Sequence, residues 1–269
     1  MEKTKEELIN KIMEESRHQF IYGYNGKLRE QFLRDMAKKY PVKLDDREPI
    51  GIYLDSIGLS KRYDANNDLV KTPLSIISRE YLYFSIVKNL LDVTLEQLLE
   101  KDLIARSEQF LNTINRFFID DKKIKVKNLR ELRDILKDAR DAYSVIYENY
   151  IENSILDESF NRLPIKFIYI DKFIREYKDM INNKSYIGVI IDQQEPIVVK
   201  SKQAINSLVA SRINADISMK IACQPDEWKM YYDLNGTLIE YIHDYNIVQF
   251  DDSYNEYMKK IKGNLDFNY

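Results

Sequence analysis

Glycine placement constrains the fold of this chain more than any other feature of its sequence. The chain has only seven glycines in 269 residues, yet Gly23 and Gly26 lie close together directly after the apolar run Phe20-Ile21-Tyr22. An average protein has about 7% glycine, so this concentration indicates a tight turn. Apolar residues at helical spacing follow the turn, and we predict a strand, a glycine turn and a helix in that order. The predicted apolar stripe of the helix is Leu28, Phe32, Leu33, Met36, Ala37 and Tyr40.

A strand, a glycine turn and a helix in this order are typical of a phosphate-binding loop. Backbone N–H groups in the turn and the positive end of the helix converge on one point and favour an anion there. The pattern is G-x-x-x-x-G-K-[ST], in which the lysine contacts the outer phosphates and the hydroxyl binds Mg²⁺. Aligned on the form G-x-N-G-x-G-K-T, the segment reads Gly23-Tyr24-Asn25-Gly26-Lys27-Leu28-Arg29-Glu30.

The segment departs from this pattern at three positions. Leu28 replaces the third glycine, Arg29 replaces the lysine, and Glu30 replaces the hydroxyl residue. Arg29 is able to hold a phosphate, whereas Glu30 would place a negative charge where the β- and γ-phosphates need neutralising. Two interpretations stay open: an intact or degenerate nucleotide loop, and an ordinary turn between a strand and a helix.

A second candidate site residue lies far along the chain, at the end of another predicted strand. The continuous apolar run 186–192 ends on Asp192, and such a run is typical of a strand buried on both faces of a parallel sheet. Ligands of α/β sheets bind at the carboxyl ends of strands, so Asp192 is the candidate Mg²⁺ ligand opposite the phosphates. Glu195 is the candidate to polarise an attacking water. The alternative is that Asp192 only ends its strand and caps the next turn.

The remaining sequence predicts a parallel sheet interrupted by a long helical region. Further strands are predicted over 49–56, 186–192, 217–223 and 247–250. Helical patterns cover 78–118, 129–150 and 165–182, and a first helix within 1–17 is predicted to cover the sheet edge. We therefore predict an α/β fold: a P-loop NTPase-like parallel five-stranded sheet with flanking helices and a large all-helical insertion. The predicted domains are a core of 1–57 and 186–269 and an insertion of 58–185.

Two further clusters allow more than one interpretation. Apolar residues repeat at alternating three- and four-residue steps at Leu129, Leu132, Leu136, Ala139, Tyr143, Ile146 and Tyr150. This stripe predicts either packing inside a helical bundle or a coiled-coil-like arm that binds a partner. The aromatic residues Trp228, Tyr231 and Tyr232 form either a stacking platform for bases or a partner surface, or they cluster only because the chain has twenty tyrosines.

Composition excludes several classes of protein. The chain is 32% charged and 12% aromatic with a net charge of −3, which argues against disorder and against bulk affinity for nucleic acid. No apolar run approaches a membrane span and the first residues are not a signal peptide, so we expect a cytoplasmic protein without a membrane partner. The single cysteine, Cys223, excludes internal disulfides, and we expect His18 and His243 to be structural.

These features together resemble the AAA-type P-loop ATPases, in particular bacterial proteins similar to the origin-recognition and Cdc6 ATPases. The likeness rests on the run 186–195, the helix to Arg212, the strand 219–225 and the run 245–252. It implies that 23–30 correspond to Walker A, that Asp192 is the Walker B ligand of Mg²⁺, and that Gln224 lies near the sensor-1 position. The cofactors it implies are ATP and Mg²⁺, with Asp192 and Glu195 as catalytic residues. The implied nucleotide-binding residues are Gly23, Tyr24, Asn25, Gly26, Lys27, Leu28, Arg29, Glu30 and Gln224.

Two departures from the family pattern predict weak or absent hydrolysis. The loop lacks its lysine and its hydroxyl residue, and the chain ends soon after the fifth strand, where the family has a helical lid. We therefore expect a regulatory or assembly subunit that acts with a protein partner or as a homo-oligomer, in bacterial DNA transactions or antiviral defence, with DNA as a further candidate partner. Two hypotheses stay open beside it. One is an interaction scaffold that uses the helical insertion without nucleotide. The other is an active ATPase with Lys27 or Arg29 replacing the lysine and Glu195 as base.

Overall fold

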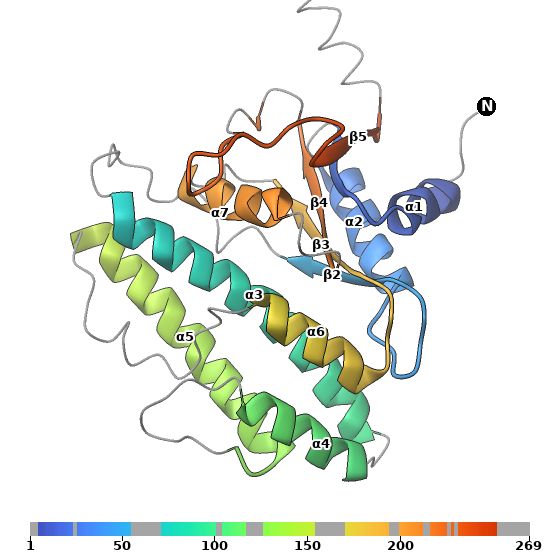
Figure 1. The fold of residues 1–269 in the computed structure, drawn as a ribbon, viewed down its shortest axis with the longest axis vertical. Helices are drawn as coiled ribbons and strands as arrows, with labels where there is room; N and C mark the ends of the chain where they lie inside the picture. Colours follow the sequence, from blue (N-terminus) through green and yellow to red (C-terminus); the bar gives the residue numbers. More distant parts are fainter. Residues whose placement is uncertain are drawn as a thin grey trace, which may run out of the picture. The chain divides into compact units, whose positions relative to one another are not determined.

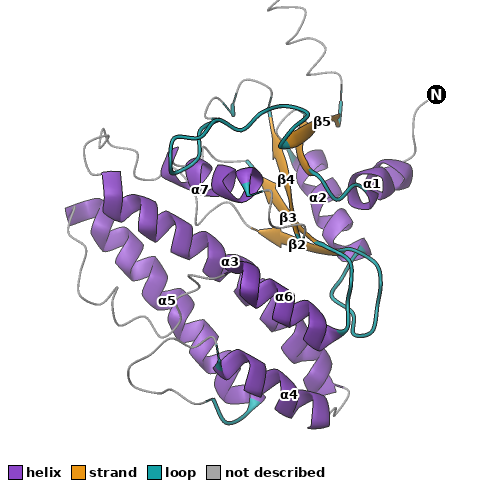
Figure 2. Ribbon diagram, viewed as in Figure 1, coloured by secondary structure: helices purple, strands orange, loops and turns teal. Residues whose placement is uncertain are grey.

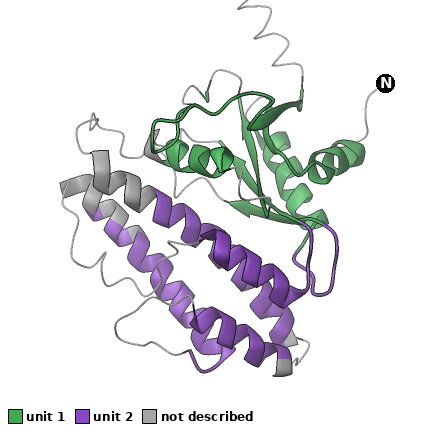
Figure 3. Ribbon diagram, viewed as in Figure 1, with its two compact units in different colours: residues 1–41, 49–61, 186–269 green, residues 42–48, 62–185 purple. Residues whose placement is uncertain are grey.

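The computed structural model of the chain divides into two compact units (Figure 3). Unit 1 comprises residues 1–41, 49–61 and 186–269, and unit 2 comprises 42–48 and 62–185. The residues that the structure describes are 5–23, 26–54, 71–100, 104–116, 126–153, 170–193, 199–211, 216–224, 227–228 and 231–251.

Unit 1 is built on a parallel five-stranded sheet (Figures 1 and 2). Its strands are β1 (His18–Tyr22), β2 (Ile50–Leu54), β3 (Ile187–Asp192), β4 (Ile217–Cys223) and β5 (Tyr245–Gln249). They lie in the order β2-β3-β4-β1-β5, and all neighbouring pairs are parallel. Every residue of β3 and β4 is buried, as expected for central strands with helices on both faces. The prediction of a P-loop NTPase-like α/β fold is confirmed.

Helices α1 (Lys5–Glu14) and α2 (Lys27–Lys39) pack on one face of the sheet. Their buried side chains form one apolar cluster with residues of four strands, namely Ile21, Ile190, Ala222 and Val248. Gly51 and Gly188 are paired in register on β2 and β3. A Cβ added at Gly188 would lie 3.0 Å from Met13 Cε, so these glycines make room for the end of α1. The N-terminal helix therefore covers a face of the sheet, and the prediction that it covers the edge is wrong.

The buried stripe of α2 differs from the prediction in its first turn. Leu28 is 84% exposed, whereas Arg29 has an exposed fraction of 0%. Phe32, Leu33 and Met36 are buried as predicted, and Arg29 lies one helical turn before them on the same face. In the first turn of α2, the side chain that faces the core is therefore the charged Arg29 and not the predicted Leu28. Its counter-charge comes from a distant strand, as described below.

Helix α7 (Val199–Ala210) and the described residues 227–228 and 231–244 cover the opposite face of the sheet (Figure 1). Phe20 of β1 packs edge-on against Trp228, with 5.4 Å between ring centroids. The Lys202 ammonium lies 5.3 Å from the centroid of the Trp228 ring. Because Trp228 is only 1% exposed, its ring belongs to the core. The alternative of a base-stacking platform centred on Trp228 is wrong.

Unit 2 is helical in its described residues. Its helices are α3 (Lys71–Glu100), α4 (Ile104–Asn115), α5 (Leu129–Asn153) and α6 (Ile170–Ile181). In α5 the predicted stripe is buried at Leu129, Leu132, Leu136, Ala139, Tyr143 and Ile146. Phe84 of α3 stacks on Tyr143 with ring centroids 4.8 Å apart. The stripe therefore packs inside the helical unit, and the alternative of a partner-binding arm built on it is wrong.

Candidate functional site

The glycine turn and the end of β3 lie at the same edge of the sheet, on either side of β4. Gly23 N donates to the carbonyl of Cys223 at 3.2 Å, and Gln193 N donates to the carbonyl of Ala222 at 2.8 Å. Both segments are therefore fixed to the last two residues of β4. The sequence predicted that these two distant segments would meet at the carboxyl ends of parallel strands, and the topology brings them together.

A buried ion pair between Arg29 and Asp192 joins the two segments. Arg29 Nε donates to Asp192 Oδ1 at 3.0 Å, and Arg29 Nη2 lies 2.7 Å from the same oxygen atom. Arg29 Nη1 donates to the carbonyl of Gly23 at 2.7 Å, and Nη2 donates to the carbonyl of Gln193 at 3.1 Å. The side chains of both charged residues have an exposed fraction of 0%. All three guanidinium nitrogens are thus bonded inside the protein.

The local sequence places the guanidinium at this point. Helix α2 begins at Lys27 directly after Gly26, whose carbonyl accepts from Glu30 N at 3.1 Å. Arg29 is therefore in the first turn, and long helical side chains point back toward the N-terminus of their helix. The turn also needs a residue without a side chain, because a Cβ at Gly23 would lie 2.8 Å from Phe250 Cδ1. The end of β5 and the guanidinium both approach the backbone of the turn closely.

The other predicted site residues lie around this pair or outside the described residues. Lys27 and Leu28 are exposed, and Glu30 pairs with Arg34 one helical turn further on at 2.9 Å. Gln224 follows β4, and its backbone N donates to Glu227 Oε2 at 2.8 Å. Tyr24, Asn25 and Glu195 lie outside the residues that the structure describes. The structure therefore brings Gly23, Arg29 and Asp192 together, and the roles assigned to all these residues stay predictions.

The described residues do not fit a magnesium–nucleotide complex of the usual kind. Mg²⁺ in such a site binds the Walker B carboxylate, but Asp192 Oδ1 is contacted twice by a buried guanidinium. The phosphate-loop lysine keeps its ammonium for the phosphates, whereas Arg29 is bonded to the protein through every nitrogen. Among described residues, no group of three or more His, Cys, Asp and Glu side chains could hold a metal ion. The guanidinium of Arg29 neutralises Asp192 at the position where P-loop ATPases use Mg²⁺.

Sequence reasoning missed a second buried cation, which lies toward the amino-terminal edge of the same sheet. Lys220 Nζ contacts the carbonyls of Glu15 at 2.5 Å and Arg17 at 3.0 Å, and Gln19 Oε1 at 2.9 Å. Burial lowers the pKa of Lys220 to about 7, opposed by the nearby Glu15 carboxylate. These three acceptors follow α1 in the chain, so Lys220 holds the connection from α1 to β1. The sequence signal for it was a lysine within a strand that is mostly apolar.

Two more predicted structural residues are buried in the same sheet. His18 Nδ1 accepts a hydrogen bond from Met219 N at 2.9 Å. Burial, with the nearby Lys220 charge, lowers the pKa of His18 to about 4, so the ring is neutral at pH 7. Desolvation raises the pKa of the buried Cys223 thiol above its usual value. The prediction of a structural histidine is confirmed for His18, whereas His243 is exposed.

The sheet order and the position of the site together define the class of this protein. A parallel sheet in the order β2-β3-β4-β1-β5, with a glycine turn after β1 and an aspartate ending β3, is an AAA-type P-loop domain. The chain belongs to the ORC-CDC6-like family, whose model matches residues 28–265. No curated protein and no solved structure gives a significant match. None of the described helices has both the length and the apolar character needed to cross a membrane.

Proposed function

We propose that this chain is a regulatory or assembly subunit of AAA type that does not hydrolyse ATP. Membership of the ORC-CDC6-like family supports an AAA-type domain, a class that generally binds nucleotide with Mg²⁺. The observation that carries the proposal is the fully buried Arg29–Asp192 pair at the place where that class holds its ligand. The pair takes over the structural role of the ligand, and the chain acts by contacting a protein partner or a second copy of itself.

The ion pair supplies an electrostatic reason for the loss of hydrolysis. In an active domain, Mg²⁺ and a lysine neutralise the phosphates and are in turn held by the Walker B carboxylate. Here the carboxylate is neutralised by Arg29, and Glu30 adds a negative charge in the first turn of α2. A magnesium–nucleotide complex would have to displace a guanidinium that has bonds to Asp192, Gly23 and Gln193. Breaking a buried pair in this way costs several kcal/mol.

The same pair explains how the sheet edge keeps its shape without a ligand. Arg29 connects the glycine turn, the start of α2 and the end of β3 through four contacts within 3.1 Å. In an active domain the ligand would make that connection, and assembly could then follow the nucleotide state. We infer that assembly of this chain is independent of nucleotide. Its setting in bacterial DNA transactions or antiviral defence is proposed from the family resemblance.

Phosphate release and analytical ultracentrifugation test this function. With ATP and Mg²⁺ present, the wild-type chain is expected to release no phosphate above the buffer blank. Its sedimentation coefficient is expected to be the same with and without nucleotide. Asp192→Ala is the test variant, and Asp134→Ala, which removes an exposed carboxylate from α5, is its matched control.

Two outcomes would contradict the proposal. Phosphate release that stops in Asp192→Ala but not in Asp134→Ala would show an active ATPase, with Lys27 or Arg29 replacing the lysine. Oligomers that form only with ATP and Mg²⁺ would show assembly that depends on nucleotide. Circular dichroism of each variant establishes that it is folded before either assay is interpreted.

A further inference from the structure

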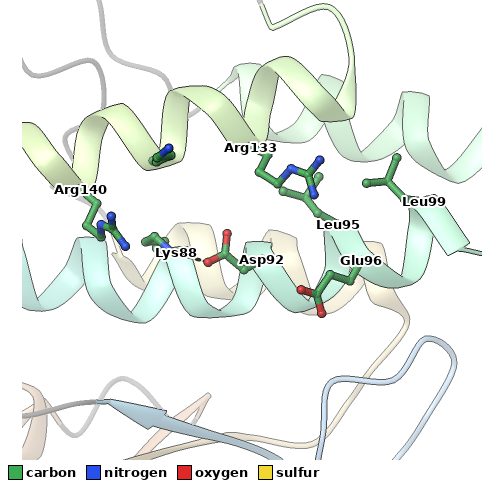
Figure 4. A pocket seen from close by; sticks show the side chains of 8 residues that line it. Lys88, Asp92, Leu95, Glu96, Leu99, Arg133 and Arg140 are labelled. Carbon is green, nitrogen blue, oxygen red and sulfur yellow. Dashed lines mark hydrogen bonds and ion pairs between the residues drawn. The ribbon is translucent and has the colours of Figure 1, made fainter.

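A hollow on the surface of unit 2 lies between α3 and α5. Its volume is about 230 Å³, and it is lined by Lys88, Asp92, Leu95, Glu96, Leu99, Arg133, Lys137 and Arg140 (Figure 4). Four of these residues are basic and two are acidic, so positive charge exceeds negative charge. Figure 4 shows Arg133 and Arg140 extending from α5 toward α3, with Lys88 and Asp92 opposite.

The basic residues of α5 form a row along one side of that helix. Arg133, Lys137 and Arg140 are spaced by four and three residues, so they lie on one face. A rise of 1.5 Å per residue separates them by about 6 Å and about 4.5 Å along the helix axis. All three are exposed, while the neighbouring positions Leu136 and Ala139 are packed in the core. The core contacts therefore fix the row at the rim of the hollow.

Two of these cations form no ion pair within the described part of the chain. Lys88 is paired with Asp92, and Arg140 Nη2 is paired with Asp141 Oδ1 at 2.8 Å. Arg133 and Lys137 have neither an ion pair nor a side-chain hydrogen bond to any described residue. They lie one helical turn apart, at the first two positions of the row. An anion in the hollow would contact both at once.

Carboxylates on both sides of the row limit the size of that anion. Asp92 and Glu96 line the hollow on α3. On α5, Asp134, Asp138 and Asp141 each follow a basic residue by one position, which turns them by about 100° to the other flank of the helix. An extended polyanion such as a nucleic acid would have to pass over these carboxylates, whereas a small anion would not.

We propose that the hollow between α3 and α5 binds a small oligophosphate, either inorganic or carried by a nucleotide. The planar guanidinium of Arg133 forms paired hydrogen bonds with phosphate oxygens, and the Lys137 ammonium adds a point charge. Leu99, which is 39% exposed, offers an apolar contact that only a nucleoside would use. This site is separate from the glycine turn and does not depend on the proposed assembly function.

Isothermal titration at low ionic strength tests this site in the full chain. Sodium tripolyphosphate, ATP without Mg²⁺ and a single-stranded oligonucleotide are titrated separately into wild type and into Arg133→Gln/Lys137→Gln. The double variant Lys172→Gln/Arg175→Gln removes the same charge from exposed positions of α6 and is the matched control. We expect the first double variant to weaken tripolyphosphate binding by roughly tenfold or more, because it removes charged hydrogen bonds. The control is expected to bind as wild type does.

Each outcome decides for or against the site. Equal affinities for tripolyphosphate and ATP would support a site that recognises the phosphates alone. Tighter binding of ATP would support a nucleotide site that uses Leu99. Absence of small-anion binding, binding of the oligonucleotide alone, or equal weakening in the control variant would overturn the proposal. Phosphate release plays no part in this test, so its result is independent of the proposed function.

Discussion

Replacing Arg29 with alanine is expected to destabilise unit 1 severely. The substitution removes a guanidinium that contacts Asp192 Oδ1 through two nitrogens and the carbonyls of Gly23 and Gln193. Asp192 is left with an exposed fraction of 0% and without its cation. Breaking a buried ion pair by removing one partner typically costs about 3–5 kcal/mol. Since domains are stable by about 5–15 kcal/mol, the loss is a large part of the total.

The size of this effect separates an ion pair from mere packing. Arg29→Met keeps apolar volume at the position but removes the charge, so its loss of unfolding free energy should approach that of Arg29→Ala. The double variant Arg29→Met/Asp192→Leu removes both charges and is expected to recover most of the loss, because a matched apolar pair is often as stable as a buried ion pair. Urea unfolding followed by circular dichroism measures all three variants and wild type.

Either of two results would refute this reasoning. If Arg29→Ala lowers the unfolding free energy by less than about 1 kcal/mol, the effect is that of an exposed ion pair. If the double variant is no more stable than Arg29→Met alone, the carboxylate of Asp192 does not depend on Arg29. Arg34→Ala, which removes a half-exposed arginine one turn from Glu30, is the matched control and should change little.

Three further predictions concern the core and the buried lysine. Leu136→Ala, at a fully buried position of α5, should lower the unfolding free energy in urea by about 2–5 kcal/mol, whereas Lys137→Ala next to it should change it by less than about 0.5 kcal/mol. Gly23→Ala, whose Cβ would lie 2.8 Å from Phe250 Cδ1, should cost about 1–3 kcal/mol, measured by thermal unfolding. The pKa of Lys220 is lowered to about 7 in the folded chain. Above pH 7 the unfolded chain therefore binds more protons at this lysine than the folded chain does. Stability should therefore rise from about pH 7 to about pH 10, and Lys220→Met should flatten that rise.

The apolar pattern was sufficient to predict most of the strands and helices. The predicted strand 217–223 coincides with β4, and the run 186–192 differs from β3 by one residue. Such runs are informative because central strands of a parallel sheet are buried on both faces. The last strand begins at Tyr245, before the predicted residue 247, because Tyr245 pairs with His18 and packs on Phe20. Those contacts are long-range and leave no periodic signal.

The candidate site could be predicted in its position but not in its chemistry. Parallel strands bring their carboxyl ends to one edge, so the meeting of the glycine turn with Asp192 follows from the order of elements. The burial of Arg29 does not follow, because charged residues are almost never fully buried unless they are paired. Its partner is distant in the sequence. For the same reason, the sequence analysis assigned Leu28 to the core and did not identify Lys220 as buried.

Magnesium-dependent ATP binding at Asp192 tests the central claim most directly. The titration uses Arg133→Gln/Lys137→Gln, so that binding in the hollow of unit 2 is weakened and contributes little heat. ATP is added with and without Mg²⁺, and the same titration is repeated with Asp192→Asn added to that variant. If the Arg29–Asp192 pair replaces the ligand, no binding that depends on Mg²⁺ will be measured. Magnesium-dependent binding that Asp192→Asn abolishes would contradict the account.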